Sequence, residues 1–422
     1  MNTMTESAVK RFTDSIQPTF KEGVLDENSR REALENLEKM DFPTTRVEAW
    51  KYTRVTKISK KEFSIQPGSV NSIDAFKIKN LDSHVLVFIN GFFSASLSSF
   101  TTEEGIEIAP LKEAKGIAGN TVPVSNEDIF TALNTAYATD GIAVKIASGK
   151  QLSKPVEVIY IQSGDTAIAN IRNVIIAEKS SAGQIILGHY SQDAKNCFSN
   201  CITEVVVEAN AHLTINKIQY ESEANYQIAT EQVKQDKDST FTINTITLNG
   251  ELVRNNLNID VLGQNCNTHL NGAYLTKGKQ HVDNHTTVDH TVANCESNEL
   301  YKGVMDDDST AVFNGKVFVR KDAQKINAFQ SNGNVLLSGN ATVNSKPELE
   351  IYADDVKCSH GSTTGQLDED AVFYLRARGL SEKNARKLLV SAFIADVLDT
   401  IESEEVRAHI DNMLLERFGW EF

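Results

Sequence analysis

The stretch QIILGHYSQDAKNCFSNCITEVVVEANAHLTINKI (184–218) decides the fold, because it holds three short β-branched runs, QIILG, EVVVEA and LTINKI. Gly, Asn, Asp and Ser separate these runs, where an α/β protein would have helices. Similar runs occur on both sides of it: VEVIYI (156–161), VIIA (174–177), FTINTITL (241–248), LNIDVLG (257–263), AVFNGKVFV (311–319) and NVLLSG (334–339). No helical pattern of ten residues interrupts them. The region therefore consists of many short strands joined by turns.

Asparagines mark the ends of these runs, with 17 of them between residues 240 and 345. Asn tolerates the left-handed backbone conformation that tight turns require. A β-sandwich would also give short strands with turns. The uniform pattern over residues 141–364 favours a solenoid instead, in which each row of strands stacks on the previous one. The sequence predicts a mainly β protein with a right-handed parallel β-helix core.

The region before the core, residues 1–140, mixes helix and strand. NSRREALENLEKM (28–40) has apolar residues at helical spacing, with Asn28 as the expected N-cap. HVLVFINGFFSASL (84–97) reads as two strands joined at Asn90-Gly91, a strong hairpin signal.

The region after the core, residues 365–422, is predicted to be helical. SEKNARKLLVSAFIADVLDTI (381–401) and SEEVRAHIDNMLLERF (403–418) begin with the N-cap candidates Ser381 and Ser403. The first segment has two adjacent apolar rows, a wider stripe than one solvent-facing helix needs. We expect a helical hairpin that packs on the β-helix and on itself, or that docks a partner.

Composition limits the function. The 422 residues carry a formal net charge of -15, which argues against a nucleic-acid partner. No run has the length or character of a signal peptide or membrane span, so a cytoplasmic protein is expected. The five cysteines are an odd number in a long intracellular chain, which makes a disulfide framework unlikely to be the organising feature.

Motifs for nucleotide chemistry are absent from the sequence. GIAVKIASGKQ (141–151) comes nearest to a phosphate-binding loop, but its glycine spacing is wrong and Gln151 replaces the magnesium-binding hydroxyl. The sequence also lacks a nucleophile elbow and a dinucleotide fingerprint. We expect the chain not to hydrolyse ATP itself.

HVDNHTTVDH (281–290) looks at first like a metal site, with His281, His285 and His290. Its composition suits a strand better than a helix, and residues four apart on a strand lie about 13 Å apart. One zinc ion cannot join His281 to His285 at that distance. We expect polar strand residues that face solvent or a partner.

Four of the cysteines are expected to be buried core residues: Cys197, Cys201, Cys266 and Cys295. DDVKCSHGST (354–363) differs, because it places Cys358 two residues from His360. On a strand both side chains share a face, at about 7 Å between Cα atoms, and can reach one metal or cluster. Such a site needs at least two more ligands from elsewhere. A buried strand-end cysteine and a Cys–His nucleophile pair remain alternatives.

These residues also carry a family resemblance. The run from ELEIYADDVKCSHG to FIADVL (348–398) resembles the SufB/SufD family of iron–sulfur cluster assembly scaffolds, as do FNGKVFVRKDAQKINAFQSN (313–332) and HVDNHTTVDH. FPTTRVEAWKYTRV (42–55) is similar to the N-terminal motif of the SufD branch. The KCSHG form of the late motif also favours SufD over SufB. The resemblance extends over almost the whole chain.

The resemblance implies a right-handed parallel β-helix flanked by helical regions, in a SufBCD complex. It implies a heterodimer with SufB through the β-helix core and docking of the ATPase SufC on the C-terminal helices. His360 matches a SufD histidine proposed as a ligand of a nascent cluster shared with SufB, and Cys358 is its neighbour. No ligand role is carried onto His281, His285 or His290, and Arg46 and Trp50 are read as structural.

The expected protein is thus a scaffold without its own enzyme activity or permanently bound cofactor, for which self-pairing in isolation is an open alternative. One rival is a carbohydrate-active β-helix enzyme of the secreted type that uses Asp306, Asp307 and Asp308. Another is a self-contained iron–sulfur or zinc protein.

Overall fold

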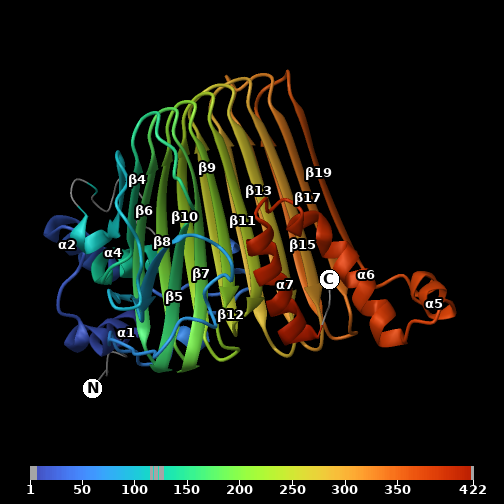
Figure 1. Cartoon of the computed structure of the whole chain (residues 1–422), viewed down its shortest axis with the longest axis horizontal. Helices are drawn as coiled ribbons and strands as arrows, with labels where there is room; N and C mark the ends of the chain where they lie inside the picture. The colour runs from blue at the N-terminus through green and yellow to red at the C-terminus, as the bar shows by residue number, and fades with distance from the viewer. Residues whose placement is uncertain (1–6, 115–116, 118–121, 123–127, 420–422) are drawn as a thin grey trace.

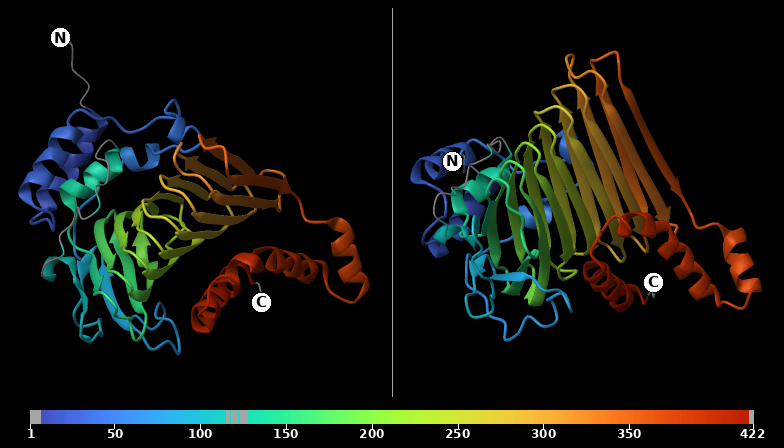
Figure 2. Two further views of the ribbon diagram at one scale, coloured as in Figure 1. Left: turned by 90° about the horizontal axis from the view of Figure 1, so that it is seen from above. Right: turned by 45° about the horizontal axis from the view of Figure 1, so that its top comes forward.

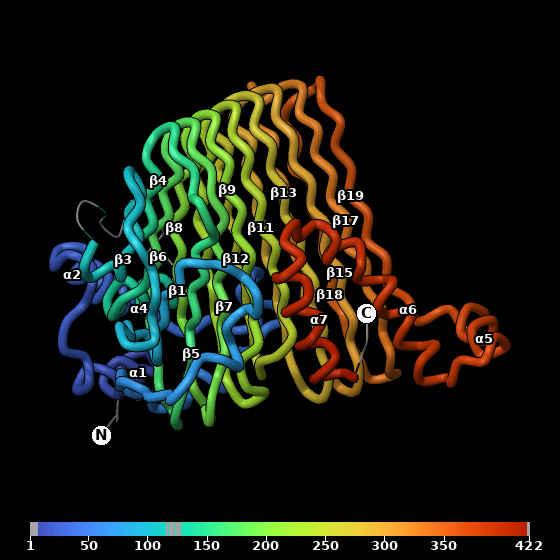
Figure 3. Tube along the Cα trace, in the orientation of Figure 1, coloured from blue at the N-terminus to red at the C-terminus, as the bar shows by residue number. Residues whose placement is uncertain are grey.

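A parallel β-helix forms the body of the molecule in a computed structural model, which describes residues 7–114, 117, 122 and 128–419. The chain alternates between two sheets, so that each coil of the helix adds one strand to each (Figures 1 and 3). Sheet 1 contains β1 (His84–Ile89), β5 (Val156–Asp165), β7 (Ala182–Lys195), β9 (His212–Tyr220), β11 (Thr240–Asn249), β13 (Asn267–Thr276), β15 (Glu296–Met305), β17 (Asn327–Leu336) and β19 (Lys357–Gly365). Sheet 2 contains β4 (Ile142–Ile146), β6 (Ile168–Ala177), β8 (Phe198–Val207), β10 (Tyr226–Gln235), β12 (Leu252–Val261), β14 (His281–His290), β16 (Thr310–Val319) and β18 (Thr342–Ile351). The predicted parallel β-helix is confirmed.

The inner faces of the two sheets enclose the main apolar core. Strands in neighbouring coils pair in parallel and in register, as Leu213 with Phe241 does in sheet 1. Because side chains alternate between faces, each coil places every second residue inside. Phe241, Leu270 and Phe313 are among these core residues, each at most 1% exposed. Each such side chain contributes about 1.5–3 kcal/mol by its removal from water.

Left-handed residues form one corner of the β-helix. Asn210, Asp238, Asn265 and Asn294 all have φ between 57° and 63° and occupy equivalent positions in successive coils. The N–H of Asn210 donates to Lys237 O at 2.9 Å, and that of Asn265 donates to Asn294 O at 3.1 Å. The corner therefore links coils as the strands do. The left-handed role predicted for the asparagines of 240–345 is confirmed for Asn265 and Asn294 and is wrong for others such as Asn244 and Asn271, which lie within strands.

The N-terminal region covers the outer face of sheet 2 over its first coils (Figure 2). Its helices are α1 (Ala8–Ile16), α2 (Glu27–Leu37), α3 (Thr56–Ser59) and α4 (Ile129–Tyr137), with short 3-10 turns at Gln17–Thr19, Glu48–Trp50 and Leu111–Glu113. The expected N-cap at Asn28 is wrong. Asp26 caps α2, because its carboxylate accepts from the backbone N–H groups of Asn28 and Ser29 at 3.0 Å.

Two short antiparallel strands close the first end of the β-helix. β2 (Phe92–Phe93) pairs with β1 in the predicted hairpin, with Asn90 and Gly91 at φ 50° and 80°. β3 (Ile106–Pro110) pairs with β4 in the same way at the edge of sheet 2. β2 and β3 are therefore the terminal strands of the two sheets at this end, and they cover the edges of β1 and β4.

The C-terminal region consists of α5 (Glu369–Ala377), α6 (Glu382–Leu398) and α7 (Glu404–Phe418). α6 and α7 lie on the outer face of sheet 1, whereas α5 projects beyond the body (Figures 1 and 2). Ser381 and Ser403 cap α6 and α7 as predicted. Among the described residues, no helix combines the length and apolar character needed to cross a membrane.

Candidate functional site at the open end of the β-helix

The last coil leaves both sheets with an uncovered edge. β19 pairs with β17 and β18 pairs with β16, and neither strand has a second neighbour within the described residues. The N–H of Lys357 donates to Ile326 O at 2.8 Å, toward the body. Since N–H groups alternate in direction along a strand, those of Cys358 and His360 point to the free edge. The backbone at this end can pair with another strand.

Cys358 and His360 lie side by side on this last strand. Cys358 is half-buried against the inner apolar core, whereas His360 is exposed. They are two residues apart, so both face the inner side of the open end, as the sequence predicted. Burial raises the pKa of the Cys358 thiol. His360 forms no hydrogen bond with any residue that the structure describes, which leaves its imidazole available.

A buried polar network lies directly beneath His360. Gln330 of β17 is its register partner and is 3% exposed. Gln330 Nε2 donates to Glu299 Oε2 at 2.6 Å, and Thr286 Oγ1 donates to Glu299 Oε1 at 2.5 Å. Burial raises the pKa of Glu299 to about 7, despite these two hydrogen bonds. The inner face thus changes from apolar to polar below the open end.

Beside this polar network, Ser345 of β18 forms hydrogen bonds that connect sheet 2 to sheet 1 at the open end. Its hydroxyl donates to Asn332 Oδ1 at 2.7 Å and lies 2.8 Å from the hydroxyl of Ser362. Serine and threonine therefore continue the inner row of β19 beyond His360, as Ser362 and Thr364. The exposed inner surface is lined by groups that bind water or a partner's polar atoms.

Side chains on the outer face of the histidine-rich strand β14 contact the N-terminal region. Asp283 is 1% exposed and pairs with Arg254 at 2.5 Å, and it accepts from Thr53 Oγ1 at 2.5 Å. Arg254 also donates to Ala49 O at 2.8 Å, and its guanidinium stacks 3.8 Å from the Trp50 ring centroid. Burial opposes ionisation of Asp283, but Arg254 and His285 hold its pKa well below the ordinary range. This ion pair fixes segment 42–55 to sheet 2.

The three histidines of β14 do not converge on one point. His281 Nε2 lies 2.9 Å from Thr53 Oγ1, and His285 Nε2 lies 2.9 Å from Asp283 Oδ1, both on the outer face. His290 is fully buried on the inner face, 2.9 Å from Ser297 Oγ. The expectation that this strand faces solvent or a partner is therefore wrong for Asp283 and His290, because the N-terminal segment and the core cover them.

The other cysteines are buried as predicted, at 0–3% exposure: Cys197, Cys201, Cys266 and Cys295. Cys266 and Cys295 follow left-handed asparagines in adjacent coils, and both thiols donate to Gly263 O, at 3.0 and 3.3 Å. Within the described part of the chain, no three His, Cys, Asp or Glu side chains are grouped to hold a metal ion. Cys358 and His360 therefore do not belong to such a group among these residues.

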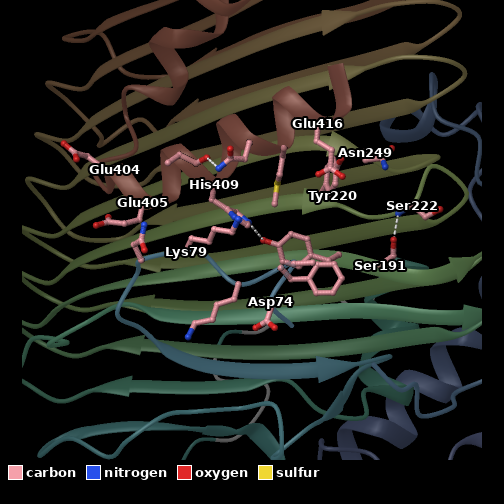
Figure 4. A pocket seen from close by; sticks show the side chains of 18 residues that line it. Asp74, Lys79, Ser191, Tyr220, Ser222, Asn249, Glu404, Glu405, His409 and Glu416 are labelled. Atoms are coloured by element: carbon pink, nitrogen blue, oxygen red, sulfur yellow. Dashed lines mark hydrogen bonds between the residues drawn. The ribbon is translucent and has the colours of Figure 1, made fainter. Parts of the chain in front are cut away.

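A separate cleft of about 890 Å³ lies between segment 74–80 and α7 (Figure 4). Tyr190 and Tyr220 of sheet 1 form its floor, and the Tyr190 hydroxyl lies 3.1 Å from His409 Nε2. Burial lowers the pKa of His409 to about 4, so this histidine is neutral at physiological pH. Because β7 and β9 lie several strands from β19 in sheet 1, this cleft is separate from the open end.

Asp306, Asp307 and Asp308 have structural roles in a turn. Asp307 Oδ2 accepts from the Gly278 N–H at 2.9 Å, and Asp308 Oδ1 accepts from Asn340 Nδ2 at 2.9 Å. Asp306 Oδ1 accepts from the N–H of Asp307. These carboxylates stabilise a corner between coils and do not form a facing pair of the kind that glycosidases use.

Comparison with known proteins agrees with this geometry. Residues 160–393 match the family model described as SUF system FeS cluster assembly, SufBD core domain, and residues 21–158 match the SufBD protein N-terminal region. The chain belongs to the SufBD family of iron–sulfur cluster assembly proteins. The core match spans most of the β-helix and includes the strand that carries Cys358 and His360.

Relatives are similar over nearly the whole length. An iron–sulfur cluster assembly SufBD family protein of Synechocystis is 32% identical over 89% of this chain and 87% of its own. The iron–sulfur cluster assembly protein SufD of Escherichia coli is 28% identical over 92% of both chains, and that of Bacillus subtilis is 24% identical over 97% of both. The resemblance to SufBD proteins inferred from sequence motifs is confirmed.

Two groups of residues cannot be found from the motifs. One is the polar network of Gln330 and Glu299 beneath the open end, and the other is the Arg254–Asp283 ion pair that fixes segment 42–55 to sheet 2. Gln330 and Glu299 lie 30 and 61 positions before His360. Gln330 falls within the quoted motif 313–332, but that motif does not connect it with His360, and Glu299 lies outside the quoted motifs. The coil length would have revealed them, since register partners in sheet 1 recur about every 30 residues. Arg254 and Asp283 likewise required knowledge of the register of β12 with β14.

Proposed function

We propose that the chain is a non-catalytic scaffold subunit on which a nascent iron–sulfur cluster is assembled at the open end of the β-helix. The observation that supports this most directly is that the last strand, β19, has a free edge and also carries Cys358 and His360. His360 would ligate the cluster through an exposed imidazole, and the half-buried Cys358 is the secondary candidate. The cluster is transient cargo, and the isolated chain holds none permanently.

The remaining ligands come, on this proposal, from SufB across a heterodimer interface. Iron–sulfur clusters are usually held by four protein ligands, and this end offers two. The free N–H groups of Cys358 and His360 favour pairing through β19. β18 is less suited to strand pairing, because Pro347 has no N–H to offer and Lys346 and Glu348 carry charge. When SufB is absent, the same edge suits a homodimer.

Docking of the ATPase SufC is proposed on the C-terminal helices. The wide apolar stripe of α6 is mostly used by the protein itself, since Val390, Ile394 and Val397 are buried on sheet 1. α5 provides the exposed apolar surface instead, with Phe373 at 72% and Tyr374 at 55% exposure. SufC would supply ATP hydrolysis in a cytoplasmic SufBCD complex.

The ligand role of His360 is tested by His360→Ala in a complex reconstituted with SufB and SufC. The exposed imidazole packs on nothing, so folding should be unchanged. Cluster yield, measured from the visible absorption of the cluster, should fall at least about tenfold, as for loss of a metal ligand. Ser359→Ala is the matched control, because Ser359 is exposed on the opposite face of β19, and it should keep the wild-type yield. A wild-type yield for His360→Ala would refute the ligand role.

The docking surface is tested by Phe373→Asp, with Phe393→Asp as the comparison. Phe373→Asp should abolish co-purification of SufC while leaving the helical content unchanged, because the side chain is exposed. Phe393 packs on sheet 1 with Lys302 Nζ 4.8 Å from its ring centroid, so Phe393→Asp should loosen α6 from the sheet. Wild-type SufC affinity with folded Phe373→Asp would exclude α5 as the docking surface.

A further inference from the structure

The Gln330 side chain is held in one orientation beneath the open end. Its Nε2 donates to Glu299 Oε2 at 2.6 Å, and Glu299 is itself fixed by Thr286. Space is limited on the side of sheet 2, where a Cβ built on Gly315 would lie 2.2 Å from Nε2. When Glu299 is ionised, the amide therefore cannot exchange its nitrogen and oxygen without losing the bond to Glu299.

The carbonyl oxygen of this amide lacks a partner. Gln330 Oε1 is buried and accepts no hydrogen bond from any residue that the structure describes. Buried acceptors of this kind are usually hydrogen-bonded, so this oxygen is open to a donor that the described residues do not supply in this conformation. Its neighbour in the next coil is His360, the register partner of Gln330 on β19.

The same protein shows how amides connect successive coils. On sheet 1, Asn244 Nδ2 donates to Asn216 Oδ1 at 2.8 Å, and Asn271 Nδ2 donates to Asn244 Oδ1 at 2.9 Å. Asn244 thus donates to the preceding coil and accepts from the following one. Gln330 makes the first half of this pattern with Glu299, and the second half requires a donor from His360.

We propose that Gln330 is a positioning residue for His360. Its Oε1 accepts the N–H of one imidazole nitrogen, and the other nitrogen is thereby directed to the open edge. Histidines that bind metals commonly donate their second N–H to an oxygen in this way, which fixes the tautomer and the ring orientation. The inference rests on the proposed ligand role of His360 for its purpose, but the hydrogen bond itself can be tested without any cluster.

The test measures the tautomer ratio of His360 by nitrogen NMR of the full chain labelled with ¹⁵N-histidine, at a pH where the ring is neutral. Gln330→Leu should change the ratio of the two tautomers about fivefold, which corresponds to a hydrogen bond of about 1 kcal/mol. Glu299→Leu should change it in the same direction by a smaller factor, because it frees the Gln330 amide to turn. Ser359→Ala, on the opposite face of β19, should leave the ratio unchanged.

Gln330→Asn keeps the position polar and withdraws the oxygen, so it gives the same test if Gln330→Leu does not fold. A folded Gln330 variant with the wild-type ratio would overturn the proposal. The result is distinguishable from failure of the proposed function. A wild-type cluster yield for His360→Ala would refute the ligand role, and the tautomer shift would still report whether Gln330 positions the ring.

Discussion

The two ends of the β-helix differ in how they finish the same repeating structure. At the first end, β2 and β3 cover both sheet edges, and Phe88 packs against Phe93 with ring centroids 5.5 Å apart. At the last end, β18 and β19 are uncovered, and the inner row finishes with Cys358, His360 and Ser362. The apolar core extends to the first end of the β-helix, whereas polar and exposed side chains replace it at the last end.

The difference leaves hydrogen-bonding groups exposed at the last end, where we propose that binding takes place. An exposed strand edge is an aggregation hazard unless a partner or a local device protects it. A fully capped solenoid needs no partner, whereas one with an open end retains hydrogen-bonding groups for another chain. The position of Cys358 and His360 at the uncapped end is the reason that we place the assembly site there.

The largest expected effect comes from opening the capped end. Phe88→Ala removes a fully buried ring from the core and should lower the free energy of unfolding by about 3–5 kcal/mol. The matched substitution at the open end is Leu349→Ala, which removes a half-buried side chain and should cost less than about 2 kcal/mol. Guanidinium denaturation followed by circular dichroism measures both. Equal costs would mean that the two ends are equally well packed.

The next effect concerns the polar network beneath the open end. The pKa of Glu299 is raised from 4.5 to about 7, so the folded state holds its proton more tightly than the unfolded state does. The contribution of protonated Glu299 to the free energy of unfolding is fully present below about pH 4.5 and is lost as the pH rises through 7. It is on the order of 3 kcal/mol in total.

Glu299→Gln should remove this loss and flatten the stability curve between pH 5 and about 7.5. Glu221, which lies nearer the capped end, has its pKa raised to about 8 by burial and provides the comparison. Glu221→Gln should flatten the dependence of the free energy of unfolding on pH over a range that extends to higher pH than the range flattened by Glu299→Gln. A Glu299→Gln profile that matches the wild type would show that Glu299 is already ionised at neutral pH.

The smallest expected effect on stability is at Cys358. Cys358→Ala should change the free energy of unfolding by less than about 1 kcal/mol, because the thiol is only half-buried. Its exposure should appear in labelling kinetics instead. A thiol reagent should modify one cysteine of the native chain and all five in denaturant, and Cys358→Ala should eliminate the native reaction. Rapid labelling of a second native thiol would show that one of the inner cysteines is accessible.

Much of the fold could be predicted from local sequence. The repeated β-branched runs and the turn residues between them are local features of each coil, and these features predict the parallel β-helix. The Asn90-Gly91 hairpin and the Ser381 and Ser403 caps depend on three or four residues each. The N-cap of α2 was placed two residues late, since Asp26 and Asn28 are both good capping residues and only the backbone geometry distinguishes them.

The sequence by itself determined the kind of fold and the position of Cys358 and His360 on one face of a strand, because strand periodicity fixes which side chains share a face. Only the tertiary structure decided which groups surround them. Gln330 and Glu299 come under His360 through the register of β15, β17 and β19, and Arg254 meets Trp50 and Asp283 through the packing of segment 42–55 on sheet 2. Such contacts join residues 29 to 230 positions apart, so they depend on the length of each coil and on its corners.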